Sequence, residues 1–471
     1  MDHRAMRGIS GIAATALLAT AAIGGCSSGT GSATSAPPAT AAPPATAAPA
    51  ATAAPAATAA PAATAAPAAT SSSTTTTSGT VLNVTLDVDS WSTAITAAIP
   101  QFEAATGITV QASTYSDDQI ENQYNVKLNA NSTDLDVMMI RPLQDLRLFE
   151  KNGWLTDLTP NVTADTSWDW KDFEPPTQSA VTLDSKVLGV PITTEQEVVM
   201  YRKDLLAKAG LAIPKTMDEF RTAMQTIVAQ NPGIYGFVGR GQANTAVTQF
   251  SSYLYGYGGD WVTADGKAAV NSPAAKAAYA FYGGLLHDFG PPGASNLTWP
   301  DAMALFTQGK AAFFTEDDNN GPEAIDPTKS AVAANVGFAQ FPAGSAGSKP
   351  YNITSFMLSV SAFSPNKDAA WKFIEWATSK AMVAQMQNQA ILGARTSVPL
   401  GSSFPADLAA VIKIETQIGM DHDRPQVINV GKARDIVGAP IVTAITGGDV
   451  NAAAEKANTD FQTLLDSEAG H

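Results

Sequence analysis

Three consecutive acidic residues follow a short apolar run, Ala-Ala-Phe-Phe at 311–314. They are Glu316, Asp317 and Asp318. Carboxylates at the end of a strand can accept hydrogen bonds from ligand hydroxyls, and such charge-assisted bonds are short and strong. Acidic residues are also favoured at helix N-termini, where they cap free backbone N–H groups. The segment therefore predicts either a ligand contact through Glu316 or Asp317, or a solvated cap.

Catalysis by these carboxylates, as in a glycoside hydrolase, is a second interpretation. The paired acids of such enzymes lie about 5 to 9 Å apart, whereas neighbours on one strand point to opposite faces. Glu316 and Asp317 are therefore poorly placed as an acid and a base. Residues 81–471 also contain no Gly-x-Ser-x-Gly motif, and the chain has no P-loop. We expect no enzymatic activity and no cofactor.

Composition argues against two other kinds of site. The chain has one cysteine, Cys26, and four scattered histidines without the close spacing of a zinc motif, so we expect no metal site and no disulfide. The net charge of −15 argues against nucleic acid as a partner, because Lys and Arg must neutralise its phosphates.

Aromatic and basic residues near predicted strand ends are further candidates for ligand contacts. An aromatic ring complements the apolar face of a sugar, and arginine donates a fork of hydrogen bonds to neighbouring oxygens. Burial in the core is the competing interpretation for each tryptophan, and Arg395 could instead tie the two lobes together. The candidates are Trp91, Trp261, Trp299, Arg240 and Arg395, with Arg141 and Gln144 as weaker ones.

The N-terminus is predicted to be an export signal. Arg4 and Arg7 precede a small, apolar run over residues 11–23, which is too short to span a membrane and typical of a signal peptide. The run ends in Ile-Gly-Gly-Cys at Cys26, which resembles a bacterial lipobox. The resemblance implies that residues 1–25 are removed and that Cys26 carries a lipid anchor. A cysteine in an ordinary signal peptide is the alternative.

Residues 26–80 are predicted to form a disordered tether. Proline recurs every six residues from Pro37 to Pro67, and threonine has the same period. Alanine, proline and threonine in this pattern cannot build a core, and the prolines break any helix. At about 3.1 Å per residue in extended form, the tether reaches on the order of 150 Å.

Residues 81–471 alternate between strand and helix patterns. Apolar alternation predicts a strand at 81–86, and a helix follows that begins near Ser92 or Thr93 and stops at Gly107. Similar units cover 135–153 and 191–210, and one long amphipathic helix is expected over 369–389. Repeated strand–helix units predict an α/β fold with a largely parallel sheet. The length predicts two lobes.

The order of several motifs resembles that of family 1 extracellular solute-binding proteins, the sugar-capturing components of ATP-driven importers. Tyr-x-Lys-Asp-Leu and Pro-Lys-Thr-x-x-Glu are two of them, at 201–205 and 214–219. The remaining matching segments are 102–110, 190–200, 287–318, 336–344, 364–380 and 393–398. Together the matches cover about residues 81–465.

This resemblance implies a two-lobed periplasmic-binding-protein-like fold of type II, with a ligand cleft between lobes joined by crossover strands. Lobe 1 would comprise residues 81–195 and 355–395, and lobe 2 residues 196–354 and 396–471. The hinge would lie near 193–199 and 353–358. Glu195 lies in the first crossover, and Tyr351 and Asn352 precede the second, where the family often places ligand contacts.

The function implied by the resemblance is capture of a neutral polyol or a di- to oligosaccharide. As a monomer, anchored by lipid at the extracytoplasmic face of the cell membrane, the protein would deliver this ligand to the permease of an ABC importer by hinge closure. A cell-surface glycoside hydrolase or a lipid-anchored wall adhesin is the alternative. A hydrolase would show turnover, whereas a receptor shows only saturable binding.

Overall fold

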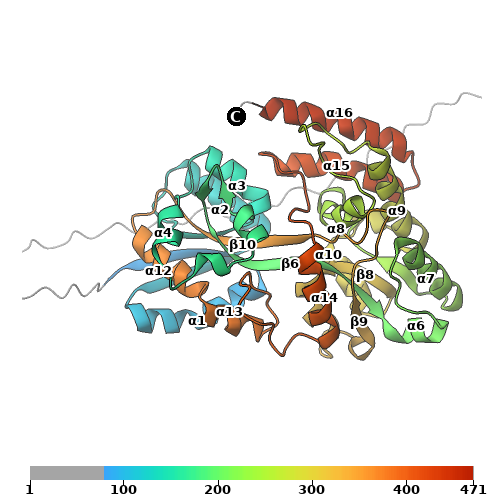
Figure 1. The fold of residues 1–471 in the computed structure, drawn as a ribbon, viewed down its shortest axis with the longest axis horizontal. Coiled ribbons are helices and arrows are strands. Elements are labelled where there is room, and N and C mark those ends of the chain that lie inside the picture. The colour runs from blue at the N-terminus through green and yellow to red at the C-terminus, as the bar shows by residue number, and fades with distance from the viewer. Residues whose placement is uncertain (1–78, 470–471) are drawn as a thin grey trace, which may run out of the picture. The chain divides into compact units, whose positions relative to one another are not determined.

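The computed structural model describes residues 79–469 of the 471-residue chain (Figure 1). The signal peptide, Cys26 and the tether up to residue 78 lie outside the described residues. Within 79–469, none of the helices combines the length and the apolar character needed to cross a membrane.

A single mixed sheet connects the described elements, in the order β2-β1-β3-β10-β6-β8-β7, with β9 also paired to β6. Its strands are β1 (Val81–Asp87), β2 (Thr109–Tyr115), β3 (Val137–Ile140), β6 (Val190–Arg202), β7 (Tyr235–Val238), β8 (Ala311–Asp317), β9 (Val336–Ala339) and β10 (Asn352–Val360). A separate hairpin pairs β4 (Thr182–Leu183) with β5 (Lys186–Val187).

The expectation of a largely parallel sheet is wrong at its centre. The outer pairs β1–β2, β1–β3 and β7–β8 are parallel. By contrast, β10 runs antiparallel to β3 and β6, and β6 runs antiparallel to β8 and β9. The reason is that β6 and β10 pass between the two halves of the fold in opposite directions.

The predicted crossover strands are confirmed. β6 pairs with β10 up to the register Asn352↔Gln196, and from Glu197↔Asp317 onward it pairs with β8. Its first half thus belongs to one half of the sheet and its second half to the other. The register with β10 is irregular between Thr354 and Met357, close to the predicted hinge.

The buried apolar residues form separate cores on the two sides of this crossing. One core contains buried residues from the ranges 82–192 and 357–394. The other side holds a large cluster from 199–341 and 427–464 and a smaller one that includes Val198, Ala390 and Leu392. We propose that the lobes divide where the cores change along β6 and β10. The predicted boundaries at 195–196 and 354–355 lie in those gaps.

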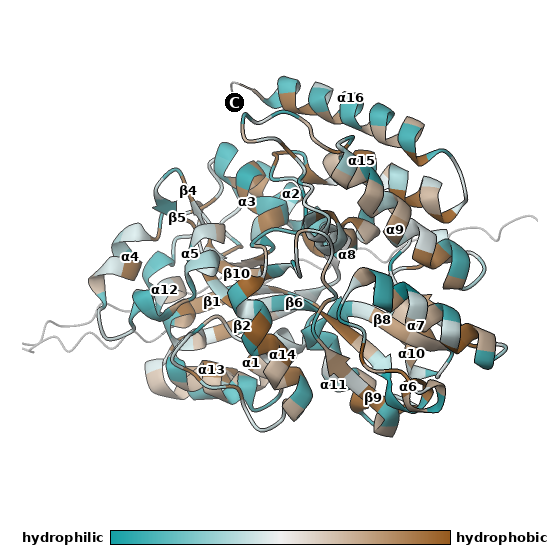
Figure 2. Ribbon diagram, turned by 45° about the vertical axis from the view of Figure 1, so that its right-hand side comes forward, coloured by the Kyte–Doolittle hydropathy of each residue, from teal (hydrophilic) through white to brown (hydrophobic). Residues whose placement is uncertain are grey.

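Helices cover both faces of the sheet (Figures 1 and 2). Lobe 1 contains α1 (Ser90–Thr106), α2 (Asp117–Asn129), α3 (Pro142–Lys151), α4 (Thr159–Ala164), α5 (Pro175–Ala180), α12 (Lys367–Ala377) and α13 (Lys380–Gln387). Lobe 2 contains α6 (Lys203–Ala209), α7 (Met217–Gln230), α8 (Ala243–Gly256), α9 (Pro273–Phe289), α10 (Trp299–Thr307), α11 (Gly321–Ile325), α14 (Ala406–Ile418), α15 (Val430–Ile445) and α16 (Val450–Glu468). Figure 2 shows α16 as mostly hydrophilic, in keeping with its few buried side chains.

Local capping explains two departures from the predicted helices. The N-cap of α1 is Asp89, whose carboxylate accepts from the backbone N–H of Trp91, and not Ser92 or Thr93. Gly107 does end this helix, with a left-handed φ of 71°. The single helix expected over 369–389 is two helices, because Ser379 caps α13 by accepting from the N–H of Met382.

Arg395 is a packing residue of lobe 1. Its guanidinium carbon lies 4.2 Å from the ring centroid of Phe173 and 5.1 Å from that of Trp168. Its Nε donates to the carbonyl of Thr378 at 2.7 Å, and its Nη1 pairs with Asp172 at 3.2 Å. All of these partners are in lobe 1, so this contact set favours a structural role over ligand contact.

We expect Arg395→Met to lower the free energy of unfolding by about 3 kcal/mol, because it leaves buried partners without their cation. Burial alone would raise the pKa of Asp172, but hydrogen bonds from Ser397, Thr396 and Arg395 hold it below its usual value. The stabilisation is therefore present at neutral pH and is lost as the pH falls through that lowered pKa.

Urea unfolding of the variant at pH 7 and at acidic pH measures both effects. Lys186→Met, which removes a largely exposed cation paired with Glu150, is the matched control and should cost less than about 1 kcal/mol. Unchanged stability of Arg395→Met together with lost ligand affinity would contradict the structural assignment.

Candidate ligand-binding site

The acidic run at the end of β8 is buried at the crossing of the lobes. Glu316 is 0% exposed, Asp317 6% and Asp318 1%, so the interpretation as a solvated turn is wrong. Asp317 does cap the single-turn helix η3 (Asp318–Asn320), since its carboxylate accepts from the backbone N–H of Asn320 at 3.2 Å. Capping and burial therefore occur together.

Glu316 holds Arg240 in place. Arg240, which follows β7, donates from Nε to Glu316 Oε2 at 3.0 Å and from Nη2 to Oε1 at 2.5 Å. Gln249 of α8 donates from Nε2 to the same Oε1 at 2.5 Å and lies 3.4 Å from the hydroxyl of Tyr351. The Arg240 side chain is 14% exposed while Glu316 is 0% exposed. Arg240 is thus the member of this pair that a ligand can reach, and Glu316 orients it.

Further carboxylates surround this ion pair. Asp317 Oδ2 lies 3.9 Å from Arg240 Nη2, and Glu195, in the middle of β6, is partly exposed. Burial raises the pKa of Glu195 to about 7; the Ser355 hydroxyl and Arg240 lower it, and the charges of Asp89 and Glu316 raise it further. Negative charge is therefore crowded where the two lobes meet.

Burial also raises the pKa values of the carboxyl groups near Glu195. Burial, followed by the charges of Glu195 and Glu316, raises the pKa of Asp317 well above its usual value. Burial also raises the pKa of Asp318 to about 8 and that of Glu197 well above its usual value. Burial thus favours the protonated form of each group, and a protonated carboxyl can donate as well as accept hydrogen bonds.

Buried polar atoms without a hydrogen-bond partner gather at the crossing. On β6 and β10 they include side-chain oxygens of Thr193, Thr194, Gln196 and Thr354. Close to the Arg240–Glu316 pair they are Gln249 Oε1, Asp318 Oδ2 and Asn319 Oδ1. Buried polar groups in folded proteins are nearly always hydrogen-bonded. Their concentration here marks a place that suits a polar ligand.

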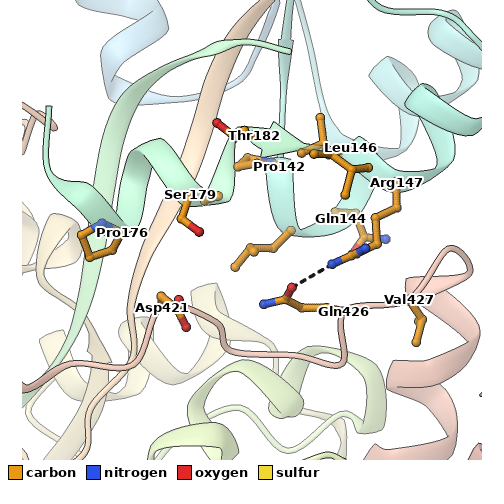
Figure 3. A pocket seen from close by; sticks show the side chains of 13 residues that line it. Pro142, Gln144, Leu146, Arg147, Pro176, Ser179, Thr182, Asp421, Gln426 and Val427 are labelled. Carbon is orange, nitrogen blue, oxygen red and sulfur yellow. Dashed lines mark hydrogen bonds between the residues drawn. The ribbon is translucent and has the colours of Figure 1, made fainter. Parts of the chain in front are cut away.

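Side chains of lobe 1 and lobe 2 also meet directly. Arg424 donates from Nη1 to Gln144 Oε1 of α3 at 3.2 Å, and its Nε and Nη2 bind both carboxylate oxygens of Asp423. Arg147 of α3 donates to Gln426 Oε1 at 3.0 Å, the bond drawn in Figure 3. The segment 421–427 of lobe 2 thus touches α3 across the cleft. We call these two contacts the interlobe bridges.

A hollow lies beside the interlobe bridges (Figure 3). Lobe 1 contributes α3, α5 and the start of the β4–β5 hairpin to its walls, and lobe 2 contributes Asp421, Gln426 and Val427. Its lining combines Pro142 and Pro176 with the polar side chains of Ser179 and Thr182. The walls of the hollow between the lobes are therefore partly apolar and partly polar.

The other residues predicted to contact the ligand differ in their burial and in their distance from the crossing of β6 and β10. Trp91 and Trp261 are 2% and 1% exposed and belong to the cores of lobes 1 and 2, which favours the competing interpretation of packing. Trp299 is 41% exposed at the start of α10. Tyr351 and Asn352 are buried beside the crossing, where the N–H of Asn352 donates to the carbonyl of Met420 at 2.7 Å.

Sequence reasoning missed several residues that the fold brings to the site. They are Asp89, Gln249, Asp423, Arg424 and Arg434. Arg434, in α15, donates to the Thr248 hydroxyl at 3.1 Å and shares the charge of Asp423 with Arg424. The charged cluster Asp421–Arg424 was an available sequence signal, whereas Gln249 lies among other polar residues of α8 and did not stand out.

Comparison with known proteins agrees with this architecture. Residues 88–384 match the sequence profile described as bacterial extracellular solute-binding protein. A mannitol-binding protein of Pseudomonas aeruginosa is 27% identical over 310 residues, which are 64% of this chain and 70% of the relative.

Two solved structures of ABC transporter solute-binding proteins have the same fold. The ribitol complex from Agrobacterium radiobacter superposes with a TM-score of 0.73 at 25% identity, over 82% of this chain and 99% of that one. The D-mannitol complex from Agrobacterium vitis gives 0.69 at 25% identity, over 83% and 99%. The profile match, the two-lobed fold and the crossover strands together show that this chain belongs to the bacterial extracellular solute-binding proteins.

Proposed function

We propose that this protein captures a polyol or a sugar in the cleft between its lobes and delivers it to the permease of an ABC importer. The observation that carries the proposal is the Arg240–Glu316 pair, set among unpartnered polar atoms at the crossing of β6 and β10. The ligands named for the compared proteins, mannitol and ribitol, support a small polyol as the first ligand to test.

The chemistry of the site suits hydroxyl groups. A hydroxyl both donates and accepts, so it can satisfy the oxygens of Glu195 and Asp317 and accept from the Arg240 guanidinium. The Thr and Ser hydroxyls of the crossover strands can do either. A polyol presents several such groups along a short chain, which matches a set of polar atoms spread over two neighbouring strands.

Closure of the lobes follows from the connections between them. β6 and β10 are the strands that pass between the cores, and the interlobe bridges join α3 to the segment 421–427. A ligand that touches Glu195 and Arg240 binds groups on both sides of the lobe boundary. It therefore binds the closed arrangement more tightly than an open one, and the difference in affinity shifts the population.

We also propose that the receptor is a monomer held at the extracytoplasmic face of the membrane through lipid on Cys26. The lipobox-like sequence before Cys26 and the low-complexity segment after it support this proposal. The segment would let the receptor reach the permease while it remains anchored.

We expect Arg240→Lys to weaken polyol binding by about ten- to hundredfold, because lysine cannot reproduce the fork held by Glu316. A thermal-shift screen of D-mannitol, ribitol and D-sorbitol identifies the ligand, and calorimetric titration then measures its affinity. Arg221→Lys is the matched control, since this arginine pairs with Asp288 on the surface of the same lobe. Wild-type affinity in Arg240→Lys would remove Arg240 from the site.

Closure is tested by small-angle scattering of the protein with and without the ligand found in that screen. We expect ligand to reduce the radius of gyration. Arg147→Gln removes one interlobe bridge. This change should weaken the affinity for the ligand about two- to tenfold, because that factor corresponds to the net contribution of one hydrogen bond. The loss should appear mainly as faster dissociation. A radius that stays constant at saturation would contradict capture by closure.

The anchor is tested by Cys26→Ser. We expect this change to move the protein from the membrane fraction to the medium, because the modified thiol is lost. Immunoblots of both fractions measure the distribution, and Ser27→Ala beside it is the control that should stay with the membrane. A Cys26→Ser protein that remains in the membrane fraction would show that the lipid anchor is absent or elsewhere.

A further inference from the structure

The centre of the cleft contains more carboxyl groups than cations. Five carboxyl groups lie together where the end of β8 pairs with the middle of β6, and we call this group the acidic pole. It consists of Glu195, Glu197, Glu316, Asp317 and Asp318. Among the described residues, the cation that acts on them is Arg240, which is already held in a two-bond pair by Glu316.

Glu195 and Asp317 are the acids left over from that pairing. The nearest approach of Arg240 to Asp317 is 3.9 Å, longer than a hydrogen bond. Glu195 is the partly exposed member of the group, and the charges of Asp89 and Glu316 act on it as well as that of Arg240. The charges of Glu195, Glu316 and Asp318 act on Asp317, whose two oxygens accept hydrogen bonds from Asn320. No protein cation is left to neutralise these two within the described structure.

A second observation points to a missing hydrogen-bond donor. Gln249 is completely buried, and its Nε2 binds Glu316 while its Oε1 has no donor. Asp318 is also buried, and its Oδ2 has no donor although its Oδ1 accepts from the N–H of Gln196 at 3.0 Å. These unpartnered atoms are acceptors beside an unneutralised acid pair. A group that is rich in donors and positively charged would complement them.

Three other arginines near the cleft do not supply this charge. Arg424 is bound through two nitrogens by Asp423. Arg141 pairs with Glu121 at 2.5 Å, and Asp145 is also beside it. Arg434 shares Asp423 with Arg424. Arg141 and Arg424 are therefore held by carboxylates outside the acidic pole, and Arg434 donates to the Thr248 hydroxyl and shares Asp423 with Arg424.

We propose that the cleft prefers a polyol or sugar that carries a protonated amine, with the ammonium held between Glu195 and Asp317, and rejects the analogue that carries a carboxylate. This inference rests on the proposed function, because it assigns a charge to the ligand of that same site. An ammonium offers three donors and a positive charge, and charge-assisted hydrogen bonds are stronger than those of a neutral hydroxyl. A carboxylate would add a sixth acid to the pole.

The affinity of the cleft for an ammonium group should depend on pH. Burial raises the pKa of Glu195 to about 7 and that of Asp317 above its usual range. A bound ammonium stabilises their ionised forms, so its binding releases protons from them. The affinity for the amine should therefore fall as the pH drops below about 7. A neutral polyol, which can pair with either protonation state, should respond less.

Three ligands of equal length test the proposal: D-sorbitol, its 1-amino-1-deoxy analogue glucamine, and D-gluconate. Titration calorimetry of the full chain at pH 7.5 should give glucamine an affinity at least tenfold above that of sorbitol, and gluconate the weakest binding. The advantage of glucamine over sorbitol should shrink at pH 5.5. Equal or weaker binding of glucamine at pH 7.5, or gluconate binding as well as sorbitol, would overturn the proposal.

Variants assign the preference to the two acids. Glu195→Gln and Asp317→Asn each keep the shape of the side chain and should reduce the ratio of glucamine to sorbitol affinity about tenfold. This ratio is insensitive to a general loss of binding, and thermal unfolding checks that each variant is folded. Glu121→Gln, which changes the exposed partner of Arg141, is the control and should keep the ratio. An unchanged ratio in both test variants would overturn the assignment.

Failure of the inference is distinguishable from failure of the proposed function. If sorbitol, D-mannitol or ribitol binds and glucamine gains nothing, the protein is a polyol receptor without selection by charge. If none of these polyols or glucamine binds, the proposed polyol receptor is wrong, and the inference that rests on it is wrong as well.

Discussion

The fold depends on the pairing of β6 with β10 on one side and with β8 and β9 on the other. Through these antiparallel pairings a single sheet extends across both lobes. Ile192 of β6 packs in the core of lobe 1, and Val198 packs in the smaller apolar cluster of lobe 2. Between those positions the strand has no apolar core of its own. Thr193, Thr194, Glu195, Gln196 and Glu197 fill this interval, so the polar residues stand where neither lobe covers them with apolar side chains.

Keeping these groups buried is costly for the folded protein. A buried ion pair such as Arg240–Glu316 loses as much in desolvation as it gains in attraction, and the extra carboxylates around it have raised pKa values because burial disfavours their charge. The stability of the two apolar cores offsets this cost. In return the guanidinium of Arg240 is held by two hydrogen bonds to Glu316, which also accepts from Gln249 of α8. The guanidinium therefore does not have to be ordered when a ligand arrives.

How much of this could be read from the sequence depended on the range of the interactions. The crossover of β6 and the acids at the tip of β8 follow from local apolar patterns and from the family resemblance, and both were predicted. The N-cap Asp89 and the break between α12 and α13 are also local, but several Ser, Thr and Asp residues competed for each cap. For Trp91 and Trp261 the sequence offered core burial beside ligand contact and could not choose between them, because their ring environments come from residues distant in the chain.

The role of Glu316 shows why site chemistry was harder to predict than the position of the site. Its place at the end of a strand indicated a ligand acceptor, and its oxygens are instead taken by Arg240 and Gln249, 76 and 67 residues earlier in the chain. The pair changes which groups a ligand can contact, because the acceptor Glu316 is covered and the donor Arg240 is accessible. The accessible acceptor becomes Glu195, which lies at the lobe boundary rather than inside lobe 2.

Contact with Glu195 couples binding to the motion of the lobes. A ligand held by Arg240 alone would bind lobe 2 in any arrangement and would shift no equilibrium. A ligand that also reaches Glu195, with Asp89 of lobe 1 close enough for its charge to act on that carboxyl, gains contacts only when the lobes approach. The affinity of the cleft and the population of the closed form are therefore set by the same few side chains at the crossing.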